Sequence, residues 1–302
     1  MLARVVCWGV LLLPMAVSCR KPAPPSDATT APGAPHNLAA LGQFPAPSRV
    51  VSLAPALTEL VYALGAGDRL VGVTRFCDFP AEARALPKIG GFLDPSVEAI
   101  LAARPELVLV ATNSGTEAIV RRLEAEGLRV LWLRLDGLND VRTGLEVVAE
   151  ALGRPEVGRT LRTALDRRIA SVTARIPHGA RRPRTLVVVG HRPLIVAGPG
   201  TWLDELVTLA GGQNAAADAN RPYPQWSAEV LLERRPEVIL DVSMGGETDL
   251  ARAELDRWRA LTAIPAVRDH RIHSVPDDRL LRPGPRVADA LELLVRLLGP
   301  TP

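Results

Sequence analysis

The chain has 302 residues, of which 47% are hydrophobic and 23% are charged, a globular composition with enough length for two core-bearing lobes. Its 36 basic and 33 acidic residues leave a formal net charge of only +3, and the charges are spread along the chain. This weak charge, together with the lack of an RNA-type aromatic motif or a zinc-finger spacing in the sequence, argues against a nucleic-acid partner.

The first residues have the pattern of an export signal. Arg4 precedes an apolar run of about 13 residues, which is short for a membrane span. The residues up to Cys19 resemble the signal of bacterial lipoproteins, in which this cysteine is lipidated; a plain secretory signal cut nearby is the alternative. The segment that follows is rich in Pro, Ala, Ser and Thr and cannot bury enough apolar surface to fold. We therefore expect a signal peptide over residues 1–18 and a lipidated, flexible tether over residues 19–47.

Strand and helix signals then alternate over residues 48–140. Short apolar runs predict strands at 50–53, 70–74, 107–110 and 129–133. Helices are expected at 55–64, from about 96 to 104 and at 116–126. This alternation predicts an N-terminal α/β lobe whose sheet is parallel and carries helices on both faces.

The pattern changes over residues 141–178, where two helices are expected without an intervening strand. The second, over 155–176, would span on the order of 33 Å, and Pro155 suits its first turn. Its apolar residues recur at spacings of four and three, namely Leu161, Leu165, Ile169 and Val172. One long helix between two lobes would limit how far the lobes can move.

A C-terminal α/β lobe is expected over residues 184–299. Its predicted strands lie at 185–189, 194–197, 238–242 and 272–275. Its predicted helices lie at 202–210, after Ser227, at 251–260 and at 285–298.

One segment of the first lobe returns in the second without a gap. Residues 96–109 are echoed by residues 227–240, and each copy has a serine, a glutamate two residues later and an Arg-Pro-Glu run before an apolar strand. The repeat predicts two similar α/β lobes built on one plan and joined by a single long backbone helix, with a ligand cleft between them.

Two acidic residues occupy matching places in this repeat. Glu98 and Glu229 each lie two residues after a serine, in the first turn of a predicted helix. A carboxylate there interacts favourably with the helix dipole, and this alone can explain both residues. Two exposed carboxylates, one per lobe, would also suit a two-fold symmetric partner that presents arginines. The repeat leaves both interpretations open.

Aromatic residues are scarce, at 4% of the chain, so those in turns are informative. Phe76, Phe92 and Tyr223 lie in segments before helices, where the loops of a parallel α/β lobe bind ligands. We expect these three rings to contact a large, flat and mostly apolar ligand. For Phe79 we expect a packing role instead.

Few other residues suggest chemistry. Cys77 is the one cysteine that remains after Cys19, and an inert packing role is expected for it. His191, at the end of a predicted strand, could hydrogen-bond a ligand or coordinate its metal, and an ordinary loop histidine is the alternative. The guanidinium group of Arg192 could anchor ligand carboxylates or amides, and a solvated loop arginine is the alternative. We expect no catalytic residues and no resident metal, because no nucleophile elbow, phosphate loop or metal-ligand spacing is present in the sequence.

Several motifs in combination resemble a known family. They are Arg49-Val-Val-Ser52-Leu-Ala-Pro55, Thr58-Glu59, Val71-Gly72-Val73-Thr74, Cys77-Asp78-Phe79-Pro80, Lys88-Ile-Gly90-Gly91-Phe92 and Arg104-Pro105-Glu106. From about Arg49 to Leu298 the chain is similar to the substrate-binding proteins of ABC importers for cobalamin, ferric siderophores and haem. Within that group it is most similar to the periplasmic cobalamin-binding proteins.

The resemblance implies a monomeric periplasmic protein, lipid-anchored at Cys19, that captures a corrinoid between its lobes and has no catalytic activity. Cobalamin would be the transported ligand and not a cofactor. Glu98 and Glu229 match the glutamates that bind arginines of the permease dimer in the membrane. The aromatic corrinoid contacts of the family match Phe76, Phe92 and Tyr223, where close relatives tend to have Tyr and Trp.

Other ligands and classes stay open at this point. A ferric siderophore would favour an arginine cluster such as Arg75, Arg192 and Arg221, and haem would favour a Tyr or His axial ligand. A metal-cluster enzyme with a related two-lobed architecture is disfavoured by the single free cysteine. A sensor without a permease is a further alternative.

Overall fold

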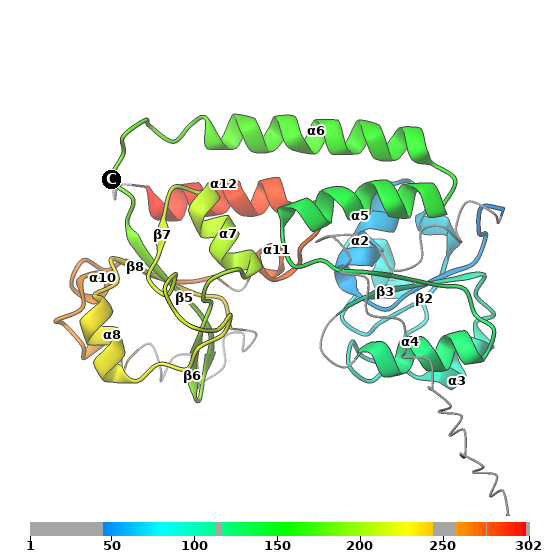
Figure 1. The fold of residues 1–302 in the computed structure, drawn as a ribbon, viewed down its shortest axis with the longest axis horizontal. Helices are drawn as coiled ribbons and strands as arrows, with labels where there is room; N and C mark the ends of the chain where they lie inside the picture. Colours follow the sequence, from blue (N-terminus) through cyan, green and yellow to red (C-terminus); the bar gives the residue numbers. More distant parts are fainter. Residues whose placement is uncertain (1–44, 113–115, 244–255, 257, 276, 300–302) are drawn as a thin grey trace, which may run out of the picture. The chain divides into compact units, whose positions relative to one another are not determined.

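The computed structural model describes residues 45–112, 116–243, 256, 258–275 and 277–299 (Figure 1). The predicted signal peptide, Cys19 and most of the predicted tether lie outside the described residues, as does most of the helix expected at 251–260. Within the described ranges, no helix is both long enough and apolar enough to span a bilayer.

The first sheet is fully parallel, as predicted. Its strands are β1 (Val50–Ser52), β2 (Leu70–Val73), β3 (Leu107–Ala111) and β4 (Val130–Leu133), in the order β2-β1-β3-β4. The side chains of β3 alternate between two hydrophobic clusters. Leu107 and Leu109 belong to the first cluster, and Val108 and Val110 belong to the second. Both faces of this sheet are therefore buried, which explains why its strands are apolar runs without polar alternation.

Helices cover both faces of this sheet. They are α2 (Pro55–Ala63), α3 (Val97–Ala102), α4 (Thr116–Ala125) and α5 (Leu138–Ala151). The apolar residues of α2 and α5 belong to the first cluster, and those of α3 and α4 to the second. Two short 3-10 turns, η1 (Gly67–Arg69) and η2 (Ala81–Ala85), complete this lobe.

The second sheet has one antiparallel edge. It contains β5 (Arg184–His191), β6 (Leu194–Val196), β7 (Gln213–Asn214), β8 (Val238–Asp241) and β9 (Ile272–Ser274). The order is β6-β5-β8-β9, in which β6 is antiparallel to β5 and the other pairs are parallel; the short β7 pairs with the beginning of β5. The helices of this part of the chain are α7 (Trp202–Leu209), α8 (Ala228–Arg234), α10 (Pro265–Arg268), α11 (Asp278–Leu281) and α12 (Val287–Leu298).

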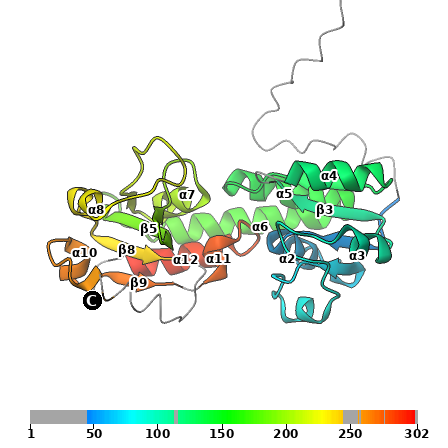
Figure 2. The same cartoon turned by 90° about the horizontal axis from the view of Figure 1, so that it is seen from below.

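The long linking helix is observed as α6 (Pro155–Thr173), slightly shorter than predicted. It packs against α5 at one end and α12 at the other (Figures 1 and 2). One hydrophobic cluster includes Leu109 of β3, Leu165 of α6, Val187 of β5 and Leu291 of α12. Because a close-packed core resists deformation, this continuous cluster restricts large movements of the two sheets relative to each other.

The sequence repeat has a structural role at the end of each repeated helix. Arg104 and Arg235 both adopt a left-handed backbone conformation, with φ of 45°. The carbonyl oxygen of Arg104 accepts a hydrogen bond from Arg49 Nε at 3.0 Å, and that of Arg235 accepts one from Arg184 Nε at 3.3 Å. The same turn and the same arginine contact therefore occur once in each lobe.

The glutamate of each Arg-Pro-Glu run also has a matching contact. Glu106 accepts a hydrogen bond from the backbone N–H of Ser48 at 2.6 Å, and Glu237 accepts one from that of Arg184 at 2.9 Å. The hydrogen bonds from Ser48 lower the pKa of Glu106. This part of the repeat thus anchors β1 to β3 in the first lobe and β5 to β8 in the second.

Candidate functional site

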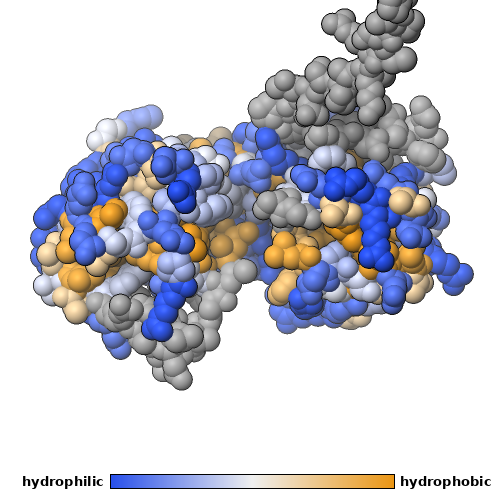
Figure 3. All heavy atoms as spheres, turned by 60° about the horizontal axis from the view of Figure 1, so that its bottom comes forward, coloured by the Kyte–Doolittle hydropathy of each residue, from blue (hydrophilic) through white to orange (hydrophobic). Residues whose placement is uncertain are grey.

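Three of the expected ligand-facing residues lie where strands end: Phe76 follows β2, and His191 and Arg192 lie at the end of β5. In a parallel sheet these carboxyl ends lie at one edge, so the loops that follow them form a common surface in each lobe. Figure 3 shows a face of the molecule that is hollowed between the two lobes. A cavity of about 410 Å³ is lined by residues of both lobes, which are Arg134, Asp136, Gly137, Asn139, Asp140, Gly200, Thr201, Asp204 and Glu205.

A hydrogen bond between the two lobes lies beside this cavity. The backbone N–H of Leu138, at the beginning of α5, donates to Glu205 Oε2 of α7 at 2.7 Å. A carboxylate at a helix N-terminus satisfies a free N–H group and interacts favourably with the helix dipole. Glu205 therefore ties the loop after β4 to the second lobe.

The three aromatic residues expected at the ligand have different environments. Phe76 follows β2 and is 48% exposed, Tyr223 is 51% exposed, and Phe92 is half-buried against the core. Within the described residues, no ring-to-ring contact joins these three side chains, which come from separate loops. The guanidinium carbon of Arg75 lies 5.1 Å from the centre of the Phe76 ring. Phe76 and Tyr223 thus offer the apolar surface that a ligand can cover.

Polar groups of the other lobe lie close enough to Tyr223 to affect its ionisation. Burial raises the pKa of the Tyr223 hydroxyl, and the negative charge of Asp136 raises it further. Asp136 follows β4, and burial together with the neighbouring Asp140 raises its own pKa. Arg134 pairs with Asp140 at 3.2 Å and with Asp136 at 3.7 Å. These three residues, Arg134, Asp136 and Asp140, form a polar rim that was not predicted from the sequence, although its position after a strand is a usable signal.

His191 is the last residue of β5 and is not an exposed loop residue. Its Nε2 atom lies 2.9 Å from Asp241 Oδ2, and its ring centre lies 5.7 Å from that of Trp258. Its buried Nδ1 atom has no hydrogen-bond partner among the described residues. Asp241 ends the neighbouring strand β8, so two strand ends hold this pair together. Arg192 follows in an exposed turn.

A smaller cavity of about 310 Å³ lies beside His191. Its lining is mostly apolar and consists of His191, Leu194, Trp226, Ala228, Leu231, Trp258 and Leu261. The combination of a histidine with two tryptophans makes this cavity suitable for an aromatic or heterocyclic group.

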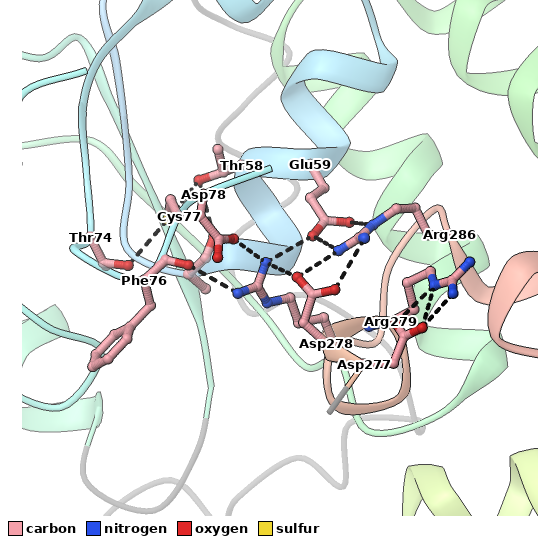
Figure 4. A network of polar contacts seen from close by, with 12 residues as sticks. Thr58, Glu59, Thr74, Phe76, Cys77, Asp78, Asp277, Asp278, Arg279 and Arg286 are labelled. Atoms are coloured by element: carbon pink, nitrogen blue, oxygen red, sulfur yellow. Dashed lines mark hydrogen bonds and ion pairs between the residues drawn. The ribbon is translucent and has the colours of Figure 1, made fainter. Parts of the chain in front are cut away.

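A cluster of charged residues joins the two lobes away from these cavities (Figure 4). This ionic cluster consists of Glu59, Asp78, Asp278, Arg282 and Arg286. Arg286 donates two hydrogen bonds to the buried carboxylate of Glu59 in α2, from Nε to Oε2 at 2.7 Å and from an Nη atom to Oε1 at 2.6 Å. Such a paired arrangement is the strongest geometry available to arginine and carboxylate.

The pKa values in the ionic cluster reflect both burial and pairing. Burial raises the pKa of Glu59, and the hydrogen bond and charge of Arg286 offset only part of this effect. Burial disfavours the charged form of the Arg286 guanidinium and would lower its pKa. The hydrogen bonds of Arg286 to Glu59 and Asp278 have the larger effect, and its pKa is raised above the ordinary value. Burial alone would raise the pKa of Asp78. The hydrogen bond from Arg282 and the positive charge of Arg282 outweigh the effect of burial, so the pKa of Asp78 is lowered.

Cys77 belongs to the core, in line with the packing role expected for it. Its side chain is buried, and its sulfur lies 3.2 Å from the hydroxyl of Thr58 and 3.1 Å from that of Thr74. Phe79 lies under the guanidinium of Arg286, whose carbon is 4.0 Å from the ring centre. Within the described ranges, no group of three or more His, Cys, Asp and Glu side chains could hold a metal ion.

Glu98 and Glu229 are both exposed in the first turn of a short helix. Ser96 Oγ accepts a hydrogen bond from the N–H of Ala99 at 3.2 Å, and Ser227 Oγ accepts one from that of Val230 at 3.5 Å. The hydrogen bond with Ser227 lowers the pKa of Glu229. The serines therefore cap the helices by themselves, and both carboxylates are accessible to a partner.

Two α/β lobes joined by a long helix, with a hollow between them, are the architecture of a two-lobed binding protein. The chain matches the family model described as periplasmic binding protein over residues 50–279, and it belongs to that family. The fold class and the family expected from the sequence are thus confirmed.

Relatives with known ligands are similar over most of their length. The vitamin B12-binding protein of Vibrio cholerae serotype O1 is 32% identical over 251 residues, which cover 82% of this chain and 88% of that protein. The crystal structure of the periplasmic vitamin B12 binding protein BtuF of Vibrio cholerae has a TM-score of 0.72 at 28% identity and covers 83% of this chain and 96% of that one. The periplasmic heme-binding protein RhuT from Roseiflexus sp. RS-1 has a TM-score of 0.75 at 31% identity, with coverages of 83% and 97%.

Proposed function

We propose that this protein captures a corrinoid between its lobes and delivers it to the permease of an ABC importer. The single observation that carries the proposal is the 32% identity over 251 residues to a vitamin B12-binding protein. The fold supports it, since exposed aromatic rings lie on loops at the edge where parallel α/β lobes bind ligands.

The two most exposed rings come from different lobes. Phe76 follows β2 of the first sheet, and Tyr223 precedes α8 of the second. A flat ligand covered on both sides by such rings would gain apolar burial with few polar contacts. The polar rim at Arg134 and Asp136 would then face the amide groups at the edge of a corrin ring, which can accept and donate hydrogen bonds.

Haem is the second candidate, because a haem-binding relative has a similar fold at 31% identity. An axial ligand to its iron would have to come from Tyr or His. Tyr223 is half-exposed, and His191 has a nitrogen without a partner among the described residues. The low exposure of His191 and the burial of its free nitrogen make it a poor axial ligand, which leaves Tyr223 as the candidate, and the identity to a vitamin B12-binding relative places the corrinoid first.

Membrane attachment and docking form the second part of the proposal. We infer that Cys19 carries a lipid, that the mature protein works as a monomer in the periplasm, and that Glu98 and Glu229 contact arginines of the permease dimer. The accessible position of both carboxylates supports the docking role. Ion pairs between exposed groups contribute little affinity, so these contacts would mainly fix the orientation of the protein on the permease.

Equilibrium titration of the purified protein with cyanocobalamin, hemin and a ferric siderophore tests the ligand. We expect cyanocobalamin to bind at one molecule per protein and to quench tryptophan fluorescence, and the other two probes to bind more weakly. Tight binding of hemin without binding of cyanocobalamin would reverse the order of the two candidates. Binding of none of the three probes would refute the proposal.

A further inference from the structure

We propose that Arg282 is a positioning residue that holds the Phe76 loop, defined as residues 75–79, at a fixed place relative to the second lobe. This inference rests on the proposed function, because Phe76 is one of the expected ligand contacts. The guanidinium of Arg282 donates to the backbone carbonyl of Phe76. The ring of Phe76 points away from Glu59, Asp278 and Arg286 (Figure 4).

The guanidinium of Arg282 contacts three different segments. One terminal nitrogen lies 2.6 Å from Asp78 Oδ1 and 3.5 Å from Glu59 Oε1, and the other donates to the carbonyl oxygen of Phe76 at 3.1 Å. The side chain also pairs with Asp278, one turn earlier in its own segment, at 2.5 Å. Arg282 thus connects the backbone and a side chain of the loop with helix α2.

The segment that carries Arg282 is attached to the second lobe. The indole N–H of Trp202 in α7 donates to the carbonyl oxygen of Leu280 at 3.0 Å, and both residues are buried. The chain continues from this segment into α12, which packs against α6 and α7. Arg282 therefore links the second lobe to a loop of the first lobe.

Arg286 provides a second attachment to the same loop. Its guanidinium covers the ring of Phe79 while it holds Glu59. The side chains of Arg282 and Arg286 are each only 15% exposed, so water screens their contacts weakly. Both ends of the loop around Phe76 are thus fixed by groups that reach across from the C-terminal segment.

Lysine cannot reproduce these contacts. Arg282 contacts Asp78 through one terminal nitrogen and the carbonyl of Phe76 through the other, whereas lysine ends in a single nitrogen that cannot occupy both positions. Arg282→Lys should therefore keep the charge of the cluster and free the carbonyl of Phe76. Arg282→Ala removes both the charge and the hydrogen bonds.

Arg279 of α11 offers a matched control, because Arg282 directly follows this short helix. Its guanidinium pairs with Asp277 of its own segment, and none of its hydrogen bonds or ion pairs within the described part of the chain reaches the loop. Arg279→Lys changes the same kind of side chain three residues away. A structural effect that is general to this segment would be equal in the two lysine variants.

Two measurements on the full protein test the proposal. In protein labelled with 4-fluorophenylalanine, the four phenylalanines give separate fluorine resonances, and that of Phe76 is assigned with a Phe76→Leu variant. The dissociation rate of cyanocobalamin, or of hemin if only hemin binds, is measured by displacement. Thermal unfolding of each variant shows whether it is folded, and if Arg282→Ala fails to fold, Arg282→Lys carries the test.

We expect Arg282→Lys to shift the Phe76 resonance of the ligand-free protein and to speed ligand dissociation by roughly five-fold or more, and Arg279→Lys to do neither. An unchanged Phe76 resonance or an unchanged dissociation rate in folded Arg282→Lys would overturn the proposal. If the unaltered protein binds neither probe, the proposed function fails, and the role of Arg282 in placing the loop is decided by the Phe76 resonance alone.

Discussion

Replacing Phe76 by alanine removes apolar surface that the proposed ligand would cover. A covered aromatic side chain buries about 150–250 Å², and 48% of Phe76 is still exposed, so the ligand can cover about 75–125 Å² more. At about 25 cal/mol per Å² the loss is about 2–3 kcal/mol, which corresponds to a roughly 30- to 160-fold weaker dissociation constant. The other half of the side chain is already buried in the protein and by the same estimate contributes about 2–3 kcal/mol to stability, so thermal unfolding must first show that the variant is folded at the temperature of the assay.

The assay is titration of cyanocobalamin into the unaltered and variant proteins at one temperature and ionic strength. Val157→Ala is the control, since Val157 is an exposed apolar residue of α6, away from the carboxyl ends of the strands. A change below about three-fold in the Phe76→Ala variant, which is under 1 kcal/mol, would refute the assignment of Phe76 to the ligand surface.

Three further predictions concern charged residues. Burial raises the pKa of Glu59 above its ordinary value of 4.5, so the folded protein binds this proton more readily than the unfolded chain. Its contribution to the free energy of unfolding therefore falls as pH rises from 4.5 through the raised pKa, and Glu59→Gln should lack this slope in urea unfolding at a series of pH values. The double change Glu98→Arg and Glu229→Arg should abolish uptake of labelled cobalamin by cells and leave its binding to purified protein unchanged. Glu237→Ala should cost about 1–3 kcal/mol of stability in urea unfolding, because the N–H of Arg184 loses its partner.

Each of these predictions has a contradicting result. Parallel pH profiles of the unaltered protein and Glu59→Gln would show that burial does not dominate at Glu59. Uptake that survives the double charge reversal would remove Glu98 and Glu229 from the docking surface. Glu233 is an exposed glutamate of α8, and a loss for Glu237→Ala no larger than for Glu233→Ala, which should stay within about 0.5 kcal/mol, would contradict the anchoring role.

The regular elements were predictable where an apolar run was long enough to form a fully buried strand or helix. Strands β1, β3 and β8 and helix α6 lie close to their expected positions. The two-residue β7 and the four-residue helices α10 and α11 were missed, because such short segments have no hydrophobic period of their own. Helix α5 begins three residues before the expected start, at a turn where Glu205, from a distant part of the chain, accepts a hydrogen bond from the N–H group of Leu138.

The ionic cluster could not be predicted in the same way. Glu59 and Arg286 are 227 residues apart in the sequence, and only the fold brings them together. One local signal was present: Glu59 lies between Leu57 and Leu60 on a helix whose other positions are mostly buried. A carboxylate on such a face needs a partner, because burial of an unpaired charge is very costly.

The repeat was recognised from the sequence, and the structure shows that its two pairs of glutamates have different environments. Glu106 and Glu237 are occupied with backbone N–H groups and serve the fold. Glu98 and Glu229 are exposed, and the serines before them already cap their helices. Of the two interpretations left open by the sequence, the docking role of Glu98 and Glu229 remains our prediction.

The structure of the complex with cyanocobalamin would test the central claim most directly. We expect the corrin ring to lie in the hollow between the lobes, in van der Waals contact with Phe76 and Tyr223. A corrin ring bound away from both residues, such as on the outer surface of one lobe, would contradict the proposed site.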